Sequence, residues 1–384
     1  MRICFFETAQ NLGGARFAAI NMARNLMKIH EVSIYDLYGS CMPFVNACMN
    51  SGVQFSVIAP NENPHFIRSA NSFIQKIWNL LTFIPHLIKM GKLMKVKIEE
   101  ENIDYVCVSD FRPLLIFLFI KPRCKIVFFA HGWYIKNQLS FYAKFLLKNI
   151  VDKIVCISEA TRHALYNEGI ATLDRLFVVH NSISEERILT SPALIDNAEG
   201  KAIILHCGGF IRGKGQLISL KIAKRLKERG VNFKLVFAGI LYQGNESIRY
   251  LETLKEYVKK EELDDNVLFV VGKSNVYDYM NACDILIHPS ETEGFPLVIM
   301  EAQILGKPVV ANAVGGVTDM VLNNYTGFIP NYNNIEEYCE VIIQLLGNKE
   351  LYALISNNSY NLAKRCFTDH QQILDLCKVF SALS

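Results

Sequence analysis

Short runs of β-branched and aromatic residues alternate with longer stretches of helical periodicity over nearly the whole chain. The pattern predicts strands at residues 2–7, 31–37, 105–109, 125–130, 153–157, 176–180, 202–207, 233–238, 267–271, 285–288, 309–311 and 327–329. Strands that alternate with helices in this way indicate βαβ units. We therefore predict an α/β fold with parallel sheets and helices on both of their faces.

A polar gap at residues 184–201, which includes Pro192, interrupts this alternation near the middle of the chain. A chain of 384 residues is also long for a single hydrophobic core. We therefore predict two Rossmann-like, doubly wound domains at residues 1–185 and 200–362. Sheets of this kind bind ligands at the carboxyl ends of their strands, so a ligand cleft is expected between the domains.

Charge is nearly balanced over the chain but is unevenly distributed. The formal net charge is +3, which does not call for a nucleic-acid partner. Residues 1–185 nevertheless carry 20 Lys and Arg against 14 Asp and Glu, which leaves the remainder slightly acidic. This asymmetry favours an anionic partner for the N-terminal half.

Eleven cysteines are scattered along the chain without a CxxC pair or a Cys/His group of zinc spacing. Several lie inside apolar runs, where a free cysteine behaves as a small buried hydrophobe, and this usage favours a reducing compartment. The N-terminus runs directly into a predicted strand without an apolar signal segment. The longest purely apolar run, residues 114–120, is too short to span a bilayer. We therefore expect a cytoplasmic protein that does not cross a membrane.

Two carboxylates stand out near the end of the strand predicted at residues 285–288. A tight loop follows this strand, and Pro296 is placed as the first residue of a helix. Glu293 then lies in the loop, and Glu301 lies on the second turn of the helix. Acidic residues near a helix N-terminus are common and usually only complement the helix dipole, so this spacing alone is weak evidence for a site.

The start of this helix is suited to binding a diphosphate. The backbone amides of Phe295 and Leu297 point forward from the helix N-terminus, where the helix dipole favours an anion. A carboxylate at Glu301 could accept both hydroxyls of a ribose. Glu293 would then meet a sugar at the other end of the ligand.

The surrounding residues resemble the donor-site signature of the retaining family-4 glycosyltransferases of GT-B fold, also called the group 1 glycosyltransferases. The resemblance rests on Glu-x7-Glu within Pro-Ser-x-x-Glu-Gly-Phe-Pro-Leu, followed by Glu301-Ala-x-x-x-Gly-Lys-Pro-Val-Val and by Gly315-Gly316. It implies that Gly294, Phe295, Pro296, Leu297 and Glu301 bind a nucleotide-sugar donor and that Glu293 is catalytic.

The resemblance extends to both halves of the chain. The loop that carries Gly13 and Gly14 is similar to the family's N-terminal glycine loop, where the missing Cβ atoms allow a ligand to approach the backbone. His131, after the strand predicted at residues 125–130, is similar to the histidine that faces the donor in the family, and the resemblance implies that it is a catalytic residue. Each of these two features taken alone also fits an ordinary turn or a packing residue. Residues 362–383 look like the family's tail helix, so we predict a third segment at residues 363–384 that crosses back to the N-terminal domain.

The loop 208–215 resembles the family's phosphate clamp but departs from it at one position. Lys214 matches the clamp lysine and is expected to act in catalysis. The family arginine is absent because Gly209 occupies its position, and Arg212 is the residue that could replace it. A cation is needed there because the leaving diphosphate is negative and no metal motif is present. We therefore expect no cofactor and no metal.

The resemblance also implies the reaction. A retaining glycosyltransferase moves a sugar from a nucleotide diphosphate to an acceptor, and the leaving phosphate assists deprotonation of the acceptor. Glu293 would orient and support the sugar without forming a covalent adduct. The acceptor is expected to be a glycan or a lipid-linked molecule in surface polysaccharide or lipopolysaccharide synthesis.

Residues 64–98 form a basic and apolar segment that contains no Asp or Glu. Such a segment can lie on an anionic membrane surface, which would suit a lipid-linked acceptor. The alternative is that the apolar residues pack on the first sheet while the lysines face solvent. The sequence leaves both open.

Two other functions fit parts of the pattern. A nucleotide-sugar epimerase can share the two-domain architecture, but it lacks this setting for the two glutamates. A binding module that has lost turnover is the second alternative, because the clamp arginine is missing. A nicotinamide oxidoreductase is more distant, since the glycine loop is not Gly-x-Gly-x-x-Gly.

Overall fold

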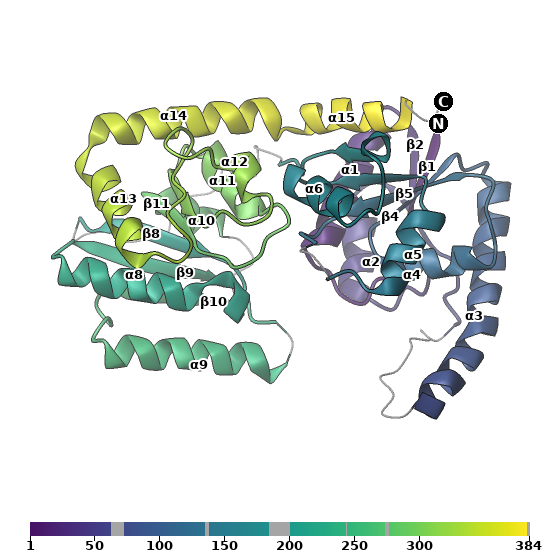
Figure 1. The fold of residues 1–384 in the computed structure, drawn as a ribbon, viewed down its shortest axis with the longest axis horizontal. Helices are drawn as coiled ribbons and strands as arrows, with labels where there is room; N and C mark the ends of the chain where they lie inside the picture. The colour runs from purple at the N-terminus through teal and green to yellow at the C-terminus, as the bar shows by residue number, and fades with distance from the viewer. Residues whose placement is uncertain (63–72, 135–137, 184–199, 243, 273–275, 382–384) are drawn as a thin grey trace. The chain divides into compact units, whose positions relative to one another are not determined.

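The computed structural model describes residues 1–62, 73–134, 138–183, 200–242, 244–272 and 276–381 (Figure 1). The chain divides into two compact units. The first contains Met1–Ser182 and Gln372–Ser384, and the second contains Ile183–Gln371. The hinge predicted at residues 184–201 lies almost wholly outside the described residues.

The first unit is built on a seven-stranded parallel sheet in the order β3-β2-β1-β4-β5-β6-β7. Its strands are β1 (Arg2–Glu7), β2 (Glu31–Asp36), β3 (Gln54–Val57), β4 (Tyr105–Val108), β5 (Lys125–Ala130), β6 (Lys153–Cys156) and β7 (Leu176–Val178). The strand β3 was not predicted, because it is a four-residue edge strand that is only partly buried and carries two polar residues.

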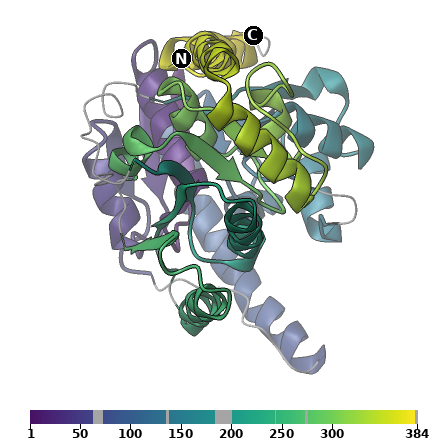
Figure 2. The ribbon, with the colours of Figure 1, turned by 90° about the vertical axis from the view of Figure 1, so that its left-hand side faces the viewer.

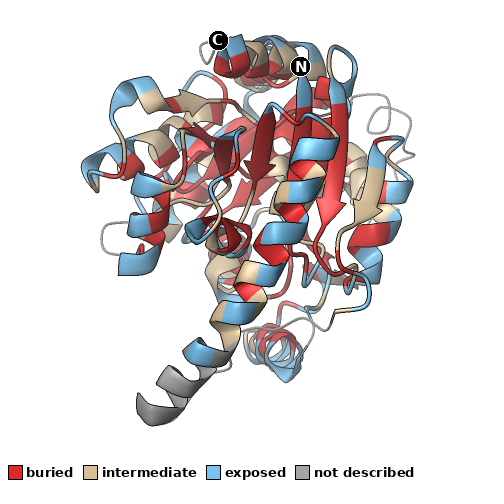
Figure 3. Cartoon of the chain, turned by 90° about the vertical axis from the view of Figure 1, so that its right-hand side faces the viewer, coloured by how far each residue is buried: buried red, intermediate tan, exposed pale blue. Residues whose placement is uncertain are grey.

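Helices cover both faces of this sheet, and the alternation along β1 shows why. Ile3 and Phe5 belong to one hydrophobic core and Cys4 and Phe6 to the other, since successive strand residues point to opposite faces. Figure 3 shows these strands buried almost throughout. The described helices of this unit are α1 (Gly14–Met27), α2 (Met42–Met49), α3 (Phe73–Glu100), α4 (Phe111–Leu115), α5 (Phe141–Asn149), α6 (Glu159–Asn167) and most of α15 (Asp369–Ser381).

The second unit has a five-stranded parallel sheet in the order β10-β9-β8-β11-β12 (Figure 2). Its strands are β8 (Ala202–Cys207), β9 (Phe233–Gly239), β10 (Val267–Val271), β11 (Ile285–His288) and β12 (Val309–Ala311). Its helices are α8 (Gln216–Glu228), α9 (Asn245–Lys260), α10 (Tyr277–Ala282), α11 (Leu297–Ile304), α12 (Val317–Met320), α13 (Ile335–Gly347) and α14 (Lys349–Cys366). The strand predicted at residues 327–329 is reduced to two isolated bridges, one between Val310 and Phe328 and one between Asn323 and Gly327.

The predicted tail helix is two helices instead of one. The helix α14 ends at Cys366, and α15 begins at Asp369. Two hydrogen bonds stabilise the break. The Phe367 carbonyl accepts one from the Ile183 amide at 3.0 Å. Thr368 Oγ1 accepts the other from the Gln371 amide at 3.2 Å, at the start of α15. Beyond the break, Leu376, Val379 and Phe380 join a core of the first unit.

The described helices include none that is long and apolar enough to cross a bilayer.

Each sheet reverses its strand order at one point, and these points locate the ligand sites expected of open parallel sheets. In the first unit the reversal lies between β1 and β4. In the second unit it lies between β8 and β11.

Candidate functional site

The loops after β8 and β11 meet at the reversal point of the second sheet. Gly215 has a φ of +77°, and a Cβ added there would lie 2.0 Å from the carbonyl oxygen of Pro289. Only glycine allows this approach without moving the backbone. The Glu291 amide also donates a hydrogen bond to the Gly213 carbonyl at 2.9 Å. The two loops are therefore held in direct contact.

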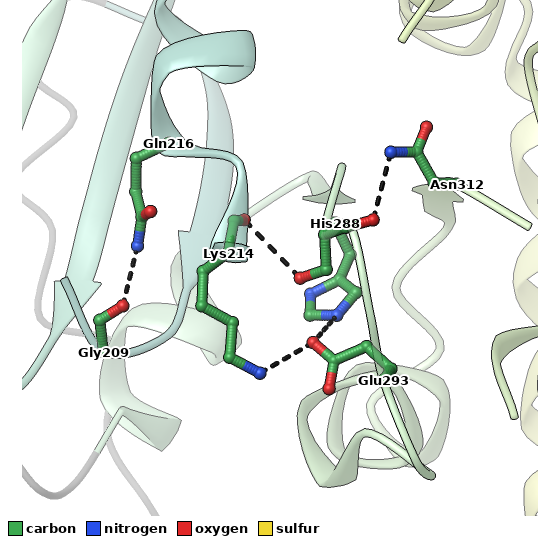
Figure 4. A network of polar contacts seen from close by, with 7 residues as sticks. Gly209, Lys214, Gln216, His288, Glu293 and Asn312 are labelled. Carbon is green, nitrogen blue, oxygen red and sulfur yellow. Dashed lines mark hydrogen bonds and ion pairs between the residues drawn. The ribbon is translucent and has the colours of Figure 1, made fainter. Parts of the chain in front are cut away.

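This contact brings together Lys214 and Glu293, two of the predicted catalytic residues (Figure 4). The ammonium group of Lys214 donates to Glu293 Oε1 at 2.8 Å. The same oxygen is 2.8 Å from Nε2 of His288, the last residue of β11. The Glu293 side chain is 8% exposed and that of Lys214 is 26% exposed. Glu293 is thus held from two directions, and Lys214 keeps access to a ligand.

The electrostatics of the site keep Glu293 ionised. Burial by itself raises the pKa of this carboxyl, but the hydrogen bonds and charges of His288 and Lys214 lower it to about 2. A buried carboxylate of this kind can support positive charge that develops on a sugar, because it remains negative at any physiological pH.

A second histidine lies behind this network. His206, near the end of β8, is buried, and its Nδ1 is 2.8 Å from the hydroxyl of Ser219 on α8. Burial, together with the charges of His288 and Lys214, lowers the pKa of His206 to about 3. His206 is therefore neutral, and it lies near enough to Lys214 and Glu293 for their charges to affect its pKa.

Asn312 fixes the loop that carries Glu293. Its Nδ2 donates to the Ser290 carbonyl at 3.1 Å and to Asn333 Oδ1 at 3.0 Å, and its Oδ1 accepts from Tyr338 at 3.1 Å. Figure 4 shows Asn312 on the far side of the loop from Lys214. The buried amide thus connects the loop after β11 to the loop before α13.

The predicted diphosphate-binding helix is α11, with one correction at its start. Pro296 has extended backbone (φ −73°, ψ 113°) and is the N-cap, so the first helical residue is Leu297 instead. Phe295 is buried and packs edge-on against Phe367 at 5.4 Å between ring centres. The Gly294 carbonyl accepts a hydrogen bond from the Gly316 amide at 3.0 Å. Gly294, Phe295, Pro296 and Leu297, four of the residues predicted to bind the donor, therefore form one packed loop and helix start.

Glu301 lies on the second turn of α11, as the spacing predicts. Its Oε1 accepts a hydrogen bond from the hydroxyl of Tyr277 on α10 at 3.2 Å. The contact orients the carboxylate, which is only partly buried. Its predicted role in binding a ribose stays a prediction.

An aromatic side chain lies beside the position of the missing family arginine. A Cβ at Gly209 would lie 2.2 Å from the ring of Tyr242, so the aromatic ring occupies the space where a side chain would begin. Arg212 is exposed, and its guanidinium carbon is 5.7 Å from the centre of the Tyr250 ring on α9. The structure brings Lys214 to Glu293 and places Arg212 against Tyr250. Whether Arg212 turns toward a diphosphate stays a prediction.

The remaining predicted residues, Gly13, Gly14 and His131, belong to the first unit. Gly13 is the N-cap of α1, and a Cβ at Gly14 would meet no atom within 4 Å. Both ring nitrogens of His131 are buried without a hydrogen-bond partner among the described residues. Burial, with a smaller effect of Arg16, lowers the pKa of His131 to about 4. This histidine is therefore a neutral hydrogen-bonding group.

No group of three His, Cys, Asp or Glu side chains that could hold a metal ion occurs among the described residues.

Sequence reasoning missed His288, His206 and Asn312. His288 had a detectable signal, since it is a polar residue at the end of an otherwise apolar strand and precedes Glu293 by five positions. Asn312 had none, because its partners are distant in sequence and meet only after the sheet has formed.

Two family models together cover most of the chain. The model described as Glycosyltransferase Family 4 matches residues 12–187, and the model described as Glycosyl transferases group 1 matches residues 192–362. The second match contains the loops that carry Lys214 and Glu293.

Similar proteins extend over both units. An uncharacterized glycosyltransferase of Haemophilus influenzae is 28% identical over 362 residues, which cover 92% of this chain and 93% of that protein. An uncharacterized glycosyltransferase of Methanocaldococcus jannaschii is 27% identical over 326 residues, which cover 82% of this chain and 86% of that protein. The crystal structure of Anabaena Alr3699/HepE in complex with UDP matches with a TM-score of 0.81 at 18% identity and covers the whole of both chains, which shows a shared fold.

Proposed function

This chain belongs to the family-4 glycosyltransferases of GT-B fold, and on that premise we propose that it transfers a sugar from a nucleoside diphosphate sugar to a glycan or lipid-linked acceptor with retention of configuration. The observation that supports this proposal most directly is the buried Glu293 carboxylate held by Lys214 and His288. The structural neighbour holds UDP, so a uridine diphosphate sugar is the first donor to test.

The proposed chemistry assigns separate tasks to the two charged residues. Cleavage of the sugar–phosphate bond builds positive charge on the sugar and negative charge on the departing diphosphate. Glu293 supports the sugar, while Lys214 and the amides at the start of α11 stabilise the diphosphate. One phosphate oxygen accepts the proton of the acceptor hydroxyl as that hydroxyl attacks. For His131 we propose the role that the resemblance implies, a contact with the nucleotide-sugar donor.

We propose that this reaction needs no metal ion, because Lys214 and the start of α11 supply the positive potential. Transfer in the presence of excess EDTA should then equal transfer with added Mg²⁺. A strict requirement for Mg²⁺ would contradict this assignment.

The acceptor side of the proposal concerns α3. Exposed Leu93 and Val96 line a shallow pocket of about 330 Å³ together with Lys92 and neighbouring residues. An apolar surface with basic residues at its edge is suited to an anionic lipid surface. We propose that α3 rests on such a surface, which would bring a lipid-linked acceptor to the enzyme.

The test of the function begins with nucleotide recognition. Thermal denaturation is measured with UDP, GDP and ADP and with their common sugar conjugates, because a ligand that binds the folded state raises the melting temperature. The matching sugar conjugate is then incubated with candidate glycan acceptors. Release of the nucleoside diphosphate together with a glycosylated acceptor supports a transferase.

The same assay separates the alternatives. An epimerase would convert the nucleotide sugar without an acceptor and without releasing the nucleotide. A binding module without turnover would be stabilised by the nucleotide but would release nothing. Either result would overturn the proposed function.

A further inference from the structure

The loops after β8 and β9 lie against each other at the carboxyl edge of the second sheet. A Cβ added at Gly239, the last residue of β9, would lie 2.0 Å from the Gly208 carbonyl oxygen. Only a glycine at this position allows the two backbones to approach so closely. The Phe210 amide donates a hydrogen bond to the Ile240 carbonyl at 3.1 Å, which continues the pairing of the two strands. The two loops are therefore fixed relative to each other.

Tyr242 follows β9 and reaches across to the loop after β8. Its amide donates to Ser247 Oγ at 3.3 Å, and the Ser247 hydroxyl donates to the Phe210 carbonyl at 2.7 Å. The three atoms nearest to a Cβ added at Gly209 all belong to the hydroxyl end of the Tyr242 ring. They are Cε2 at 2.2 Å, Cζ at 2.8 Å and the hydroxyl oxygen at 3.0 Å. The hydroxyl is thus held over the end of β8, while the side chain as a whole is 48% exposed.

Lys214 lies over the adjacent residue of the same loop. A Cβ at Gly208 would be 3.8 Å from Cγ and Cδ of the Lys214 side chain. The Gly209 carbonyl is fixed by Gln216, whose Nε2 donates to it at 2.9 Å (Figure 4). One glycine is therefore covered by a side chain that carries an ammonium group, and the next by the hydroxyl end of Tyr242. The strand order of the second sheet reverses here, at the point where open parallel sheets bind ligands.

The surroundings of the Tyr242 hydroxyl favour a phosphate as its partner. Lys214 supplies positive charge on the same loop, and the start of α11 supplies backbone amides that attract an anion. A phenol hydroxyl can donate a hydrogen bond to a phosphate oxygen, and such a bond is stronger than one between uncharged groups. The ammonium of Lys214 also contacts Glu293, which is proposed to support the sugar. The phosphate beside Lys214 is then the one bonded to the sugar.

We propose that Tyr242 is a diphosphate-binding residue, and that its hydroxyl donates a hydrogen bond to the phosphate that carries the sugar. Gly209 and Tyr242 act as a pair, because the glycine leaves open the space that the hydroxyl end of the ring occupies. Any side chain at position 209 would displace the ring. This inference rests on the proposed transferase function and does not depend on whether Arg212 also reaches the diphosphate.

Removal of the hydroxyl alone tests this role. Calorimetry measures the binding of UDP, GDP and ADP to the unaltered chain and to Tyr242→Phe, which keeps the ring. The matching monophosphates, UMP, GMP and AMP, are measured by displacement. The control is Tyr325→Phe, which removes the hydroxyl of another exposed tyrosine in the turn after α12.

We expect Tyr242→Phe to bind the diphosphate about tenfold more weakly than the unaltered chain, because one hydrogen bond to a charged group is lost. Binding of the monophosphate should change much less, since it lacks the second phosphate. The ratio of the two affinities should therefore fall. Tyr325→Phe should bind both nucleotides as the unaltered chain does.

Gly209→Ala tests the pairing of the two residues. The added methyl group would push the Tyr242 ring out of its place, so this variant should lose as much diphosphate affinity as Tyr242→Phe. The double variant should lose no more than either single variant, because both substitutions remove the same hydrogen bond.

Three results would overturn the role of Tyr242: diphosphate affinity unchanged in Tyr242→Phe, equal losses for monophosphate and diphosphate, or additive losses in the double variant. If a diphosphate binds the unaltered chain and one of these results is found, the proposed function stands and only the role of Tyr242 fails. If no nucleoside diphosphate binds the unaltered chain, both are contradicted.

Discussion

Glu293 accepts from two side chains at one oxygen, and this geometry determines how the residue responds to acid. Its pKa of about 2 lies below the ordinary value of 4.5, so the ionised carboxylate stabilises the folded state. The stabilisation is complete above pH 4.5 and is lost as the pH falls through that value toward 2. A shift of this size corresponds to roughly 3 kcal/mol.

Glu293→Gln should remove this acid-dependent contribution. Urea unfolding at several pH values between 7 and 3.5 should show a constant difference in the free energy of unfolding above pH 4.5. Below pH 4.5 this difference in the free energy of unfolding should shrink by up to about 1.4 kcal/mol per pH unit. The protonation of His131 and His206 also lowers stability in acid. It does so equally in both proteins for His131 and nearly equally for His206, because the charge of Glu293 is the smallest of the effects on the pKa of His206. A difference that does not vary with pH would contradict the charge assigned to Glu293.

Lys214 is expected to act mainly as the bond breaks, because the charge on the leaving diphosphate grows in the transition state. Lys214→Ala should therefore lower kcat by about 10²–10³-fold and weaken donor binding much less. If Arg212 replaces the missing clamp arginine, Arg212→Ala should lower kcat as Lys214→Ala does. The double variant should then lose less activity than the product of the two separate effects, because both residues act on one diphosphate. A silent Arg212→Ala would leave Arg212 in its contact with Tyr250 and contradict the clamp assignment.

Among the elements, the contact between the loops after β8 and β11 holds the site together. Gly215→Ala would force a Cβ against the Pro289 carbonyl at a positive φ, so we expect a loss of at least about 2 kcal/mol in the free energy of unfolding. Gly213→Ala is the matched control, because nothing lies within 4 Å of a Cβ there. Urea unfolding should place this control within about 0.5 kcal/mol of the unaltered chain. Equal stability of the two variants would rule out the tight loop contact.

The elements also show what could be predicted from the sequence. The strands of both sheets have strong apolar patterns, and eleven of the twelve predicted runs correspond to named strands. The edge strand β3 escaped prediction because its residues are only partly buried. The break between α14 and α15 depends on a contact with Ile183, nearly two hundred positions away.

Prediction of the site was similarly partial. The spacing of Glu293 and Glu301 is local and could be recognised in the sequence. The contacts of Glu293 with Lys214 and of Asn312 with Tyr338 could not, because they depend on how the strands are ordered in the sheet. A pocket of about 570 Å³ in the first unit, lined by Phe111, Trp133 and Tyr142 among others, was also missed, since Phe111 and Tyr142 belong to separate helices.

At the scale of the whole molecule, the basic segment predicted to contact a membrane is partly neutralised. Lys89 forms an ion pair with Glu62, and Lys95 pairs with Glu99 at 3.7 Å. Ion pairs at an exposed surface are weak, so these lysines remain able to exchange their partners for lipid phosphates. The membrane proposal thus depends on whether these lysines bind lipid phosphates more strongly than they bind Glu62 and Glu99.

Reversing the charge of this surface tests that balance. Replacement of Lys89, Lys92 and Lys95 by Glu should abolish sedimentation with anionic liposomes at modest salt and leave donor hydrolysis almost unchanged. The matched control replaces three exposed lysines of α9, Lys255, Lys259 and Lys260, and changes the net charge equally. If both triple variants bind liposomes as the unaltered chain does, the lysines of α3 only face solvent.

The central claim is that the second unit binds a nucleoside diphosphate through Glu301 and the start of α11. Calorimetry with UDP, GDP and ADP tests it most directly, on the unaltered chain, on Glu301→Ala and on Glu340→Ala as an exposed control. We predict that at least one nucleotide binds the unaltered chain and the control equally. Glu301→Ala should bind it about tenfold to a hundredfold more weakly, since charged hydrogen bonds contribute about 1.5–3 kcal/mol. Unchanged affinity in a folded Glu301→Ala, or no binding of any nucleotide by the unaltered chain, would contradict the account.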